Sequence, residues 1–110
     1  MTRLTSDFWV SAYRKHLEML DIPCYVVARG HAQAGAVFVK VNTLDGNACV
    51  YQRSFDLMTG ARQWVELTRG PEADCDAALS RQRGFDPDLW VLEVEDRQGR
   101  HLLDTPHLNA

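Results

Sequence analysis

The chain has 110 residues, of which 45% are apolar and 25% are charged, a composition typical of one folded globular domain. Its Lys and Arg residues number 12 against 15 Asp and Glu residues, which gives a net charge of −3. A protein that neutralises several nucleic-acid phosphates normally has a basic surface and a high isoelectric point. Nucleic-acid binding is therefore not expected.

Cysteine usage and the N-terminal residues indicate a reducing compartment. The three cysteines, Cys24, Cys49 and Cys75, are odd in number and form no Cys-x-x-Cys pair, which fits neither a disulfide framework nor a zinc ribbon. The first residues contain no apolar run, so no signal peptide is expected. The longest unbroken apolar run is too short to span a membrane. We therefore expect a cytoplasmic protein.

The first predicted element is an amphipathic helix. Thr5, Ser6 and Asp7 are N-cap residue types, and apolar side chains then recur at helical spacing from Phe8 to Leu20. Pro23 ends the pattern, because the residue before a proline disfavours the helical region.

Four strands are predicted next, over residues 25–29, 36–42, 48–55 and 62–68. The Asp45-Gly46 pair is typical of a tight hairpin turn. If these two residues form the loop, Val41 faces Val50 and Lys40 faces Tyr51. On that register one side of the sheet carries a group of aromatic and cationic side chains: Phe38, Lys40, Tyr51, Arg53 and Trp64.

A second helix is predicted from Pro71 to about Arg83 and is closed by Gly84. A strand over residues 89–95 and a short returning strand over 100–103 complete the order α-β-β-β-β-α-β-β. This order predicts an α+β fold with an antiparallel sheet of about five or six strands and both helices packed on one face. Alternation alone leaves open which face they cover. We expect a single domain over residues 1–104 and a loose C-terminal tail over 105–110.

Several strings in the sequence carry a resemblance to a known family. They are Phe8-Trp9-Val10, Ala28-Arg29-Gly30, Gly35 to Asn42, Asp45-Gly46 and Phe85-Asp86-Pro87-Asp88-Leu89-Trp90-Val91. Together they resemble the bacterial, alphaproteobacterial-type family known as domain of unknown function 1491, over roughly residues 4–104. The resemblance implies a small cytoplasmic single-domain protein, and it supplies no activity, cofactor or catalytic residue.

No metal site or cofactor is predicted. The histidines lie at no zinc-ligand spacing from one another or from a cysteine; they are His16, His31, His101 and His107. The grouping of His101, Asp104 and His107 would need a helix to align its ligands, and Pro106 interrupts it.

No catalytic residue is predicted either. Cys75 lies near the start of the second helix, but it falls on the apolar stripe, so we interpret it and the other cysteines as core residues. Five acidic residues near the C-terminus are interpreted as turn-forming and solubilising groups rather than as a catalytic pair: Asp86, Asp88, Glu93, Glu95 and Asp96. The segment from Gly30 to Gly35 leads into a strand, which favours a tight turn or bulge over a phosphate-binding loop.

Two hypotheses about function follow. The first is a non-enzymatic interaction or accessory module that acts through a sheet face or an edge strand, such as the one from Leu89, as a homodimer or with another protein. Phe38 and Trp64 are its candidate interface residues. The alternative is a small ligand- or anion-binding protein or enzyme whose site contains four candidate residues: Arg29, Lys40, Tyr51 and Arg53.

Overall fold

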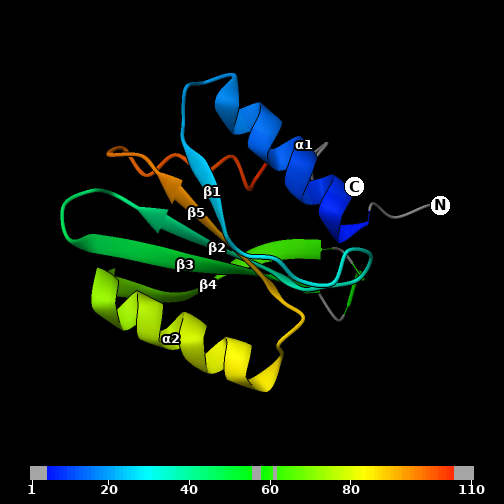
Figure 1. Cartoon of the computed structure of the whole chain (residues 1–110). Helices are drawn as coiled ribbons and strands as arrows, with labels where there is room; N and C mark the ends of the chain where they lie inside the picture. Colours follow the sequence, from blue (N-terminus) through cyan, green and yellow to red (C-terminus); the bar gives the residue numbers. More distant parts are fainter. Residues whose placement is uncertain (1–4, 56–57, 61, 106–110) are drawn as a thin grey trace.

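The computed structural model describes residues 5–55, 58–60 and 62–105. Two helices and five strands follow one another along the chain (Figure 1). They are α1 (Ser6–Glu18), β1 (Cys24–Ala28), β2 (Val37–Asn42), β3 (Asn47–Phe55), β4 (Arg62–Pro71), α2 (Glu72–Phe85) and β5 (Trp90–Glu95).

The strands form one mixed sheet in the order β1-β5-β2-β3-β4. β5 pairs in parallel with β2, and every other neighbouring pair in the sheet is antiparallel. The α+β class and the strand number are therefore confirmed, with one parallel pair in an otherwise antiparallel sheet. Because β5 lies between β1 and β2, the strand that begins after Leu89 is central, and the prediction that it is an edge strand is wrong.

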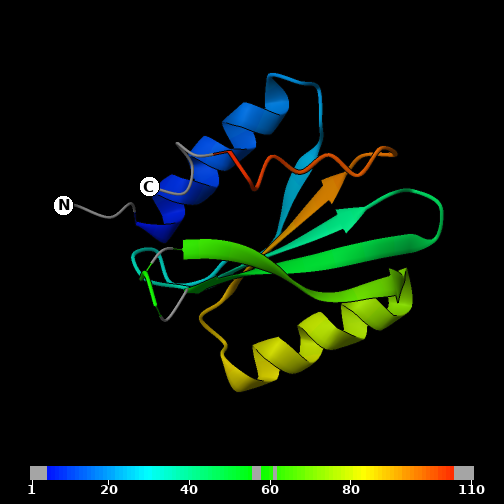
Figure 2. The ribbon, with the colours of Figure 1, turned by 180° about the vertical axis from the view of Figure 1, so that it is seen from behind.

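The two helices cover opposite faces of the sheet, as Figures 1 and 2 show from front and back. Trp9, Tyr13 and Leu17 of α1 pack against alternate valines of β2 on one face. Cys75 and Leu79 of α2 pack with Phe38 and Val50 on the other. The prediction that both helices pack on one face is therefore wrong. In agreement with the observed placement, β2 is buried along its whole length, as expected of a strand that is covered on both sides.

The β2–β3 hairpin has a longer loop than the sequence predicts. Asn42 pairs with Ala48, and Lys40 pairs with Val50 rather than with Tyr51. Thr43 to Gly46 form a four-residue turn, in which Leu44 has a φ of 63°. A shift of one residue moves side chains to the opposite face of a sheet, so Phe38 and Lys40 face α2 while Tyr51 faces α1.

The returning strand predicted over residues 100–103 is absent, and this segment packs across the α1 face as an irregular chain. Leu102 has a φ of 56°, which interrupts an extended conformation. The Tyr13 hydroxyl donates to the carbonyl of His101 at 2.7 Å, and Leu103 is 1% exposed. The segment therefore completes the α1-side core, while most of the predicted tail lies outside the described residues.

Both helices differ slightly from prediction at their ends. α1 begins at Ser6 and ends at Glu18, with Thr5 as its N-cap. α2 begins directly after Pro71, as predicted, but it continues through Gly84 to Phe85. Neither helix has the length and apolar character needed to cross a bilayer in the described part of the chain.

Candidate functional site

Lys40 lies beneath α2 and is 3% exposed. Its ammonium group contacts Glu72 at 2.8 Å, Asp76 at 2.7 Å and Glu93 at 3.3 Å. Burial alone lowers the pKa of Lys40, but the hydrogen bonds to Asp76 and Glu72 and the charge of Glu93 outweigh it and raise the pKa above its ordinary value. The charge of Lys40 is thus used within the fold, between β2, β5 and the start of α2.

Arg53 lies on the opposite face, between two tryptophans. Its guanidinium carbon is 4.8 Å from the ring centroid of Trp9 and 5.3 Å from that of Trp64. The two indole rings are 5.3 Å apart. Arg53 and Trp64 therefore join β3 and β4 to α1 through cation–π contacts.

Of the remaining predicted residues, Tyr51 shares the α1 face with Arg53, and the others lie elsewhere. Arg29 follows β1, and its guanidinium carbon is 5.0 Å from the ring centroid of Trp90. Tyr51 is half-buried on the α1 face, with its ring 4.7 Å from that of His101. Phe38 is buried under α2 and faces no solvent. The structure thus brings neither the four ligand-site candidates nor the two interface candidates into one surface.

The three thiols are arranged as core groups rather than nucleophiles. Burial raises the pKa of Cys24 to about 11, and burial is also the main cause that raises the pKa values of Cys49 and Cys75. The thiol of Cys75 donates to the carbonyl of Ala48 at 3.4 Å. Since the thiolate is the reactive form, these environments disfavour nucleophilic chemistry.

Among the described residues, no three ligand-type side chains gather as a metal site. His101 is half-buried, and burial lowers its pKa; His107 lies outside the described residues. The acidic residues near β5 have local partners instead. The backbone N–H of Asp88 donates to the Asp86 carboxylate at 3.0 Å, and Asp96 accepts from Arg100 at 3.0 and 3.1 Å.

The turn from Gly30 to Gly35 allows a close backbone contact, as the sequence predicts. A side chain at Gly35 would meet the carbonyl oxygen of Asp88 at 2.5 Å, and Gly30 is equally crowded by the same carbonyl. The N–H of His31 donates to this carbonyl at 2.8 Å. These glycines therefore let the turn pack against the loop that leads into β5.

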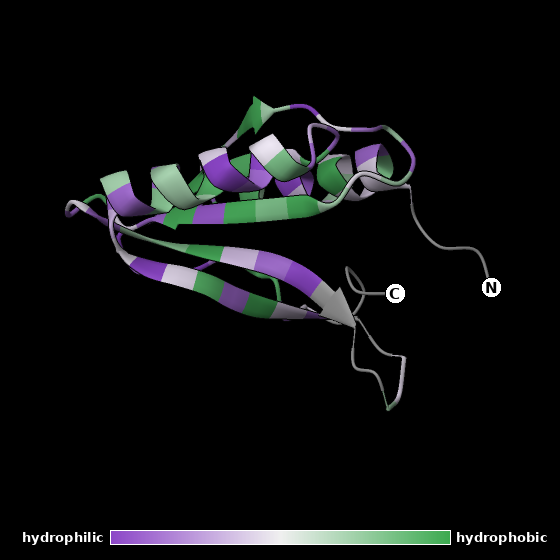
Figure 3. Ribbon diagram, turned by 90° about the horizontal axis from the view of Figure 1, so that it is seen from below, coloured by the Kyte–Doolittle hydropathy of each residue, from purple (hydrophilic) through white to green (hydrophobic). Residues whose placement is uncertain are grey.

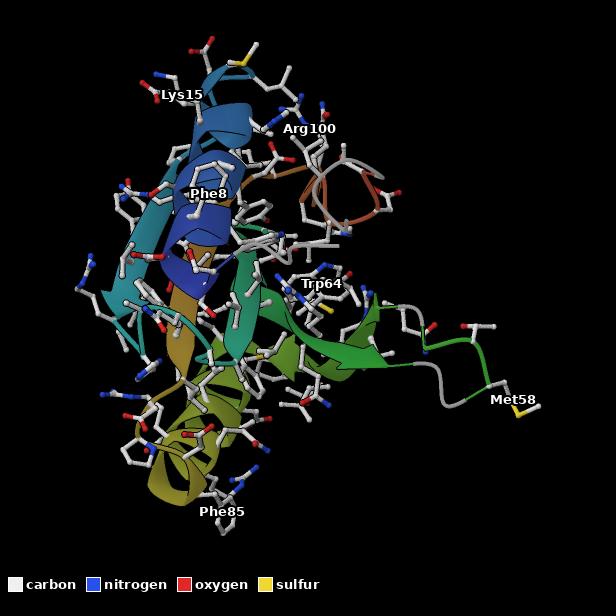
Figure 4. The ribbon with its side chains drawn as sticks, turned by 90° about the vertical axis from the view of Figure 1, so that its right-hand side faces the viewer. Phe8, Lys15, Met58, Trp64, Phe85 and Arg100 are labelled. Atoms are coloured by element: carbon white, nitrogen blue, oxygen red, sulfur yellow. The ribbon has the colours of Figure 1, made fainter. Side chains whose placement is uncertain are left out.

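One surface that the sequence did not single out is the outer edge of β1, which borders the sheet (Figure 4). Tyr25 and Val27 are 52% and 57% exposed. The N–H of Glu95 donates to the carbonyl of Pro23 at 3.0 Å. Because inward- and outward-facing backbone groups alternate in antiparallel pairs, Tyr25 also faces β5, while Cys24 and Val26 direct their N–H and C=O groups outward.

A second surface is a pocket of about 490 Å³ at the end of the sheet where β2, β4 and β5 end. Thr43 and Asp45 line it from the turn after β2, Arg69 lies near the end of β4, and residues 97–99 follow β5. Its inner wall contains Val41, Cys49 and Tyr51. Of these residues the sequence predicted only Tyr51 as a site residue, because the parallel pairing that brings the other segments together is a long-range feature.

These features define a small α+β domain with a mixed five-stranded sheet between two helices. Residues 4–104 match the family model described as protein of unknown function (DUF1491). The chain belongs to this family, as its sequence strings predicted.

Solved structures of the family agree with this fold. A crystal structure of a DUF1491 family protein from Caulobacter crescentus is 39% identical, with a TM-score of 0.84 over 92% of this chain and 95% of that one. An NMR structure of a family protein from the same organism is 38% identical, with a TM-score of 0.81 over 94% of each chain. The solution structure of a protein from A. tumefaciens is 29% identical, with a TM-score of 0.79 over 93% of each chain. A search among curated proteins finds no match.

Proposed function

We propose that this protein is a non-enzymatic interaction module that pairs with a second copy of itself through the outer edge of β1. The observation that carries the proposal is that, among the described strands, none pairs with the outward backbone groups of Cys24 and Val26. The exposed side chains of Tyr25 and Val27 lie beside them. An edge of this kind is a template for strand addition.

The opposite edge of the sheet supports the choice of β1. β4 is interrupted by a bulge opposite Val50 and Tyr51, and it contacts α2. Its exposed Glu66 and Arg69 form an ion pair at 2.8 Å. Bulges and charges are features that protect an edge from pairing, whereas the helix contact does not distinguish the two edges, since β1 also contacts α1. β1 has a bulge only after Val26 and carries no charged side chain between Cys24 and Ala28.

The charges at the two ends of β1 favour a second copy as the occupant. Asp21 precedes the strand and Arg29 follows it. Antiparallel pairing about a two-fold axis at Tyr25 sets Cys24 opposite Val26 of the other copy. It also brings each Asp21 toward the end that carries the other Arg29, which is favourable. Two aromatic rings then meet at the axis.

The test is the molar mass in solution, measured by sedimentation equilibrium from micromolar to millimolar protein. We expect a dimer for the unmodified chain. Val26→Pro removes an outward N–H that no neighbouring strand uses, a position where an edge strand tolerates proline, and it should give a monomer. Val27→Lys should also give a monomer, because it adds a charge to the edge, whereas Val27→Thr is the matched uncharged control and should remain a dimer.

Charge reversal tests the orientation. Asp21→Lys should weaken the dimer because it sets like charges together, and the double variant Asp21→Lys with Arg29→Glu should restore it. Melting temperatures and circular dichroism of each variant show whether the fold is retained. A monomeric unmodified protein at millimolar concentration, or a folded Val26→Pro variant that still dimerises, would overturn the proposal.

A further inference from the structure

The geometry points to an anion-binding site in the pocket at the carboxyl ends of β2, β4 and β5. The ligand class is a small molecule that presents a carboxylate or phosphate group to Arg69 and Arg97. The inference is independent of the proposed dimer, because the pocket and the β1 edge use different residues.

The position of the pocket follows from the topology. β2 and β5 are parallel, and β4 runs in the same direction as β2 because each is antiparallel to β3. The loops after β2 and β5 therefore lie at one end of the sheet, as Figures 1 and 2 show. The crevice beyond the carboxyl ends of parallel strands is where open sheets commonly bind ligands, and a pocket of about 490 Å³ is in the range of small-molecule sites.

Arg97 supplies a cation that forms no ion pair with the described residues. It is exposed in the turn after β5, and it lines the pocket. The neighbouring Arg100 is the residue that binds Asp96, at 3.0 Å, so the turn does not depend on Arg97. A guanidinium in this position can bind an oxyanion through two parallel hydrogen bonds.

Arg69 lies on the β4 side and is fixed in orientation. Its Nε and Nη2 donate to one carboxylate oxygen of Glu66 at 3.0 and 2.8 Å. The thiol of Cys49 donates to the same oxygen at 3.3 Å. The hydrogen bond from Arg69 is the first cause that lowers the pKa of Glu66, so this carboxylate stays ionised and holds Arg69 at the pocket.

The inner wall is neutral and contains hydrogen-bond donors. Burial is the main cause that raises the pKa of Tyr51 to about 12, and burial also raises the pKa of Cys49. Both groups therefore keep their protons at neutral pH. On this wall the Tyr51 hydroxyl is the donor offered to a bound oxyanion, since the Cys49 thiol already donates to Glu66.

Asp45 carries the carboxylate at the rim of the pocket, and one of its two oxygens already accepts hydrogen bonds within the turn. Oδ1 accepts from the Thr43 hydroxyl at 2.6 Å and from the backbone N–H of Asn47 at 3.1 Å. The hydrogen bond from Thr43 is the first cause that lowers its pKa. Since Glu66 already pairs with Arg69 at 2.8 Å, Arg97 is the cation of the lining that is available to a ligand.

The test is a titration of the ¹⁵N-labelled full chain, followed by two-dimensional NMR, with citrate and with inorganic phosphate as separate probes. Sodium chloride keeps the ionic strength constant, since weak surface binding is screened by salt. We expect saturable shifts confined to the amides around the pocket, such as Asn47, Gly70 and Gly99. Saturation by citrate alone indicates an organic carboxylate ligand, and saturation by phosphate indicates a phosphate ligand.

Arg97→Gln should weaken binding of the saturating probe roughly tenfold or more, the effect of losing a hydrogen bond to a charged group. Tyr51→Phe should weaken it by about two- to tenfold. Arg81→Gln removes the same charge from exposed α2 and should leave the affinity unchanged. Shifts that do not saturate with either probe, or an Arg97→Gln variant that binds as well as Arg81→Gln, would overturn the inference.

Discussion

Lys40 and Arg53 are two cations held on opposite faces of the same sheet by different means. Lys40 is surrounded by three carboxylates within 3.3 Å, whereas Arg53 lies between the indole rings of Trp9 and Trp64. The carboxylates around Lys40 depend on its charge, since they repel one another without it. The indole rings require only a flat, weakly hydrated group. The structure therefore tolerates a neutral side chain at position 53 much better than at position 40.

The largest effect is expected from Lys40→Met. The substitution keeps most of the buried methylene chain but leaves three carboxylates without their cation, which should lower the free energy of unfolding by about 2–4 kcal/mol. This range is below that of a fully buried pair, because the side chains of Glu72 and Asp76 are 39% and 56% exposed. Urea denaturation at neutral pH measures it, and a loss below that of Arg53→Met would contradict the comparison.

The pH dependence of the same variant has a definite sign. The folded-state pKa of Lys40 is raised above its unfolded value, so its stabilisation is complete below the unfolded pKa of about 10.4. It is lost as the pH rises from there toward the folded pKa. The difference in stability between the unmodified chain and Lys40→Met should therefore be constant from pH 8 to about 10 and should shrink above it. A difference that grows with rising pH would show that the three carboxylates do not stabilise the charged form of Lys40.

A smaller effect is expected from Arg53→Met, which replaces the guanidinium by an apolar group that can still contact both indole rings. The loss of two partly exposed cation–π contacts should cost about 1 kcal/mol. Urea denaturation is again the measurement, with near-ultraviolet circular dichroism to follow Trp9 and Trp64. A cost as large as that of Lys40→Met would mean that the charge of Arg53 matters as much as that of Lys40.

The α1 face should also respond to acid through His101. Burial lowers the folded-state pKa of His101 below 6.5, so its contribution to stability is present above pH 6.5 and is lost as the pH falls through the folded pKa. His101→Gln should therefore have a shallower loss of stability below pH 6.5 than the unmodified chain. Melting temperatures from pH 7.5 to 5 provide the comparison, and parallel curves would contradict it.

The smallest effect is expected from Asp76→Asn. The amide oxygen can still accept from Lys40, and the change removes one of the surplus negative charges at the cluster. Because the Asp76 side chain is 56% exposed, stability should change by no more than about 0.5 kcal/mol in either direction. A loss near that of Lys40→Met would indicate that all three carboxylates are required together.

The placement of these two cations also shows what the sequence could and could not predict. The helical spacing of α1 and the extended runs of the strands depend on nearby residues, and they were predicted within a few positions. The register of the β2–β3 hairpin was not predicted correctly. The amide oxygen of Asn42 accepts from the N–H of Leu44 at 2.8 Å, and this local bond lengthens the turn. The resulting shift of one residue moved Tyr51 and Arg53 away from Lys40.

The sequence of β2 contains an indication that the helices cover opposite faces of the sheet, but hydrophobic alternation alone does not reveal it. β2 reads Val-Phe-Val-Lys-Val-Asn, and its bulky Phe38 between valines is consistent with burial on both faces. β2 is mostly apolar in Figure 3, whereas hydrophilic and hydrophobic residues alternate along β4. The pocket at the carboxyl ends could not be predicted in the same way, because it depends on the parallel pairing of β2 with β5, which lie far apart in the sequence.

The position of β5 in the sheet affects the order in which the fold can form. Strand β5 is the last helix or strand of the described residues, yet it lies between β1 and β2 and supplies residues to both core clusters. During synthesis, β1 lacks its described neighbouring strand, and the α1-side core lacks Trp90 and Leu92, until β5 has left the ribosome. Contacts of such long sequence separation slow folding. The α1-side core can therefore be completed only after β5 has been synthesised.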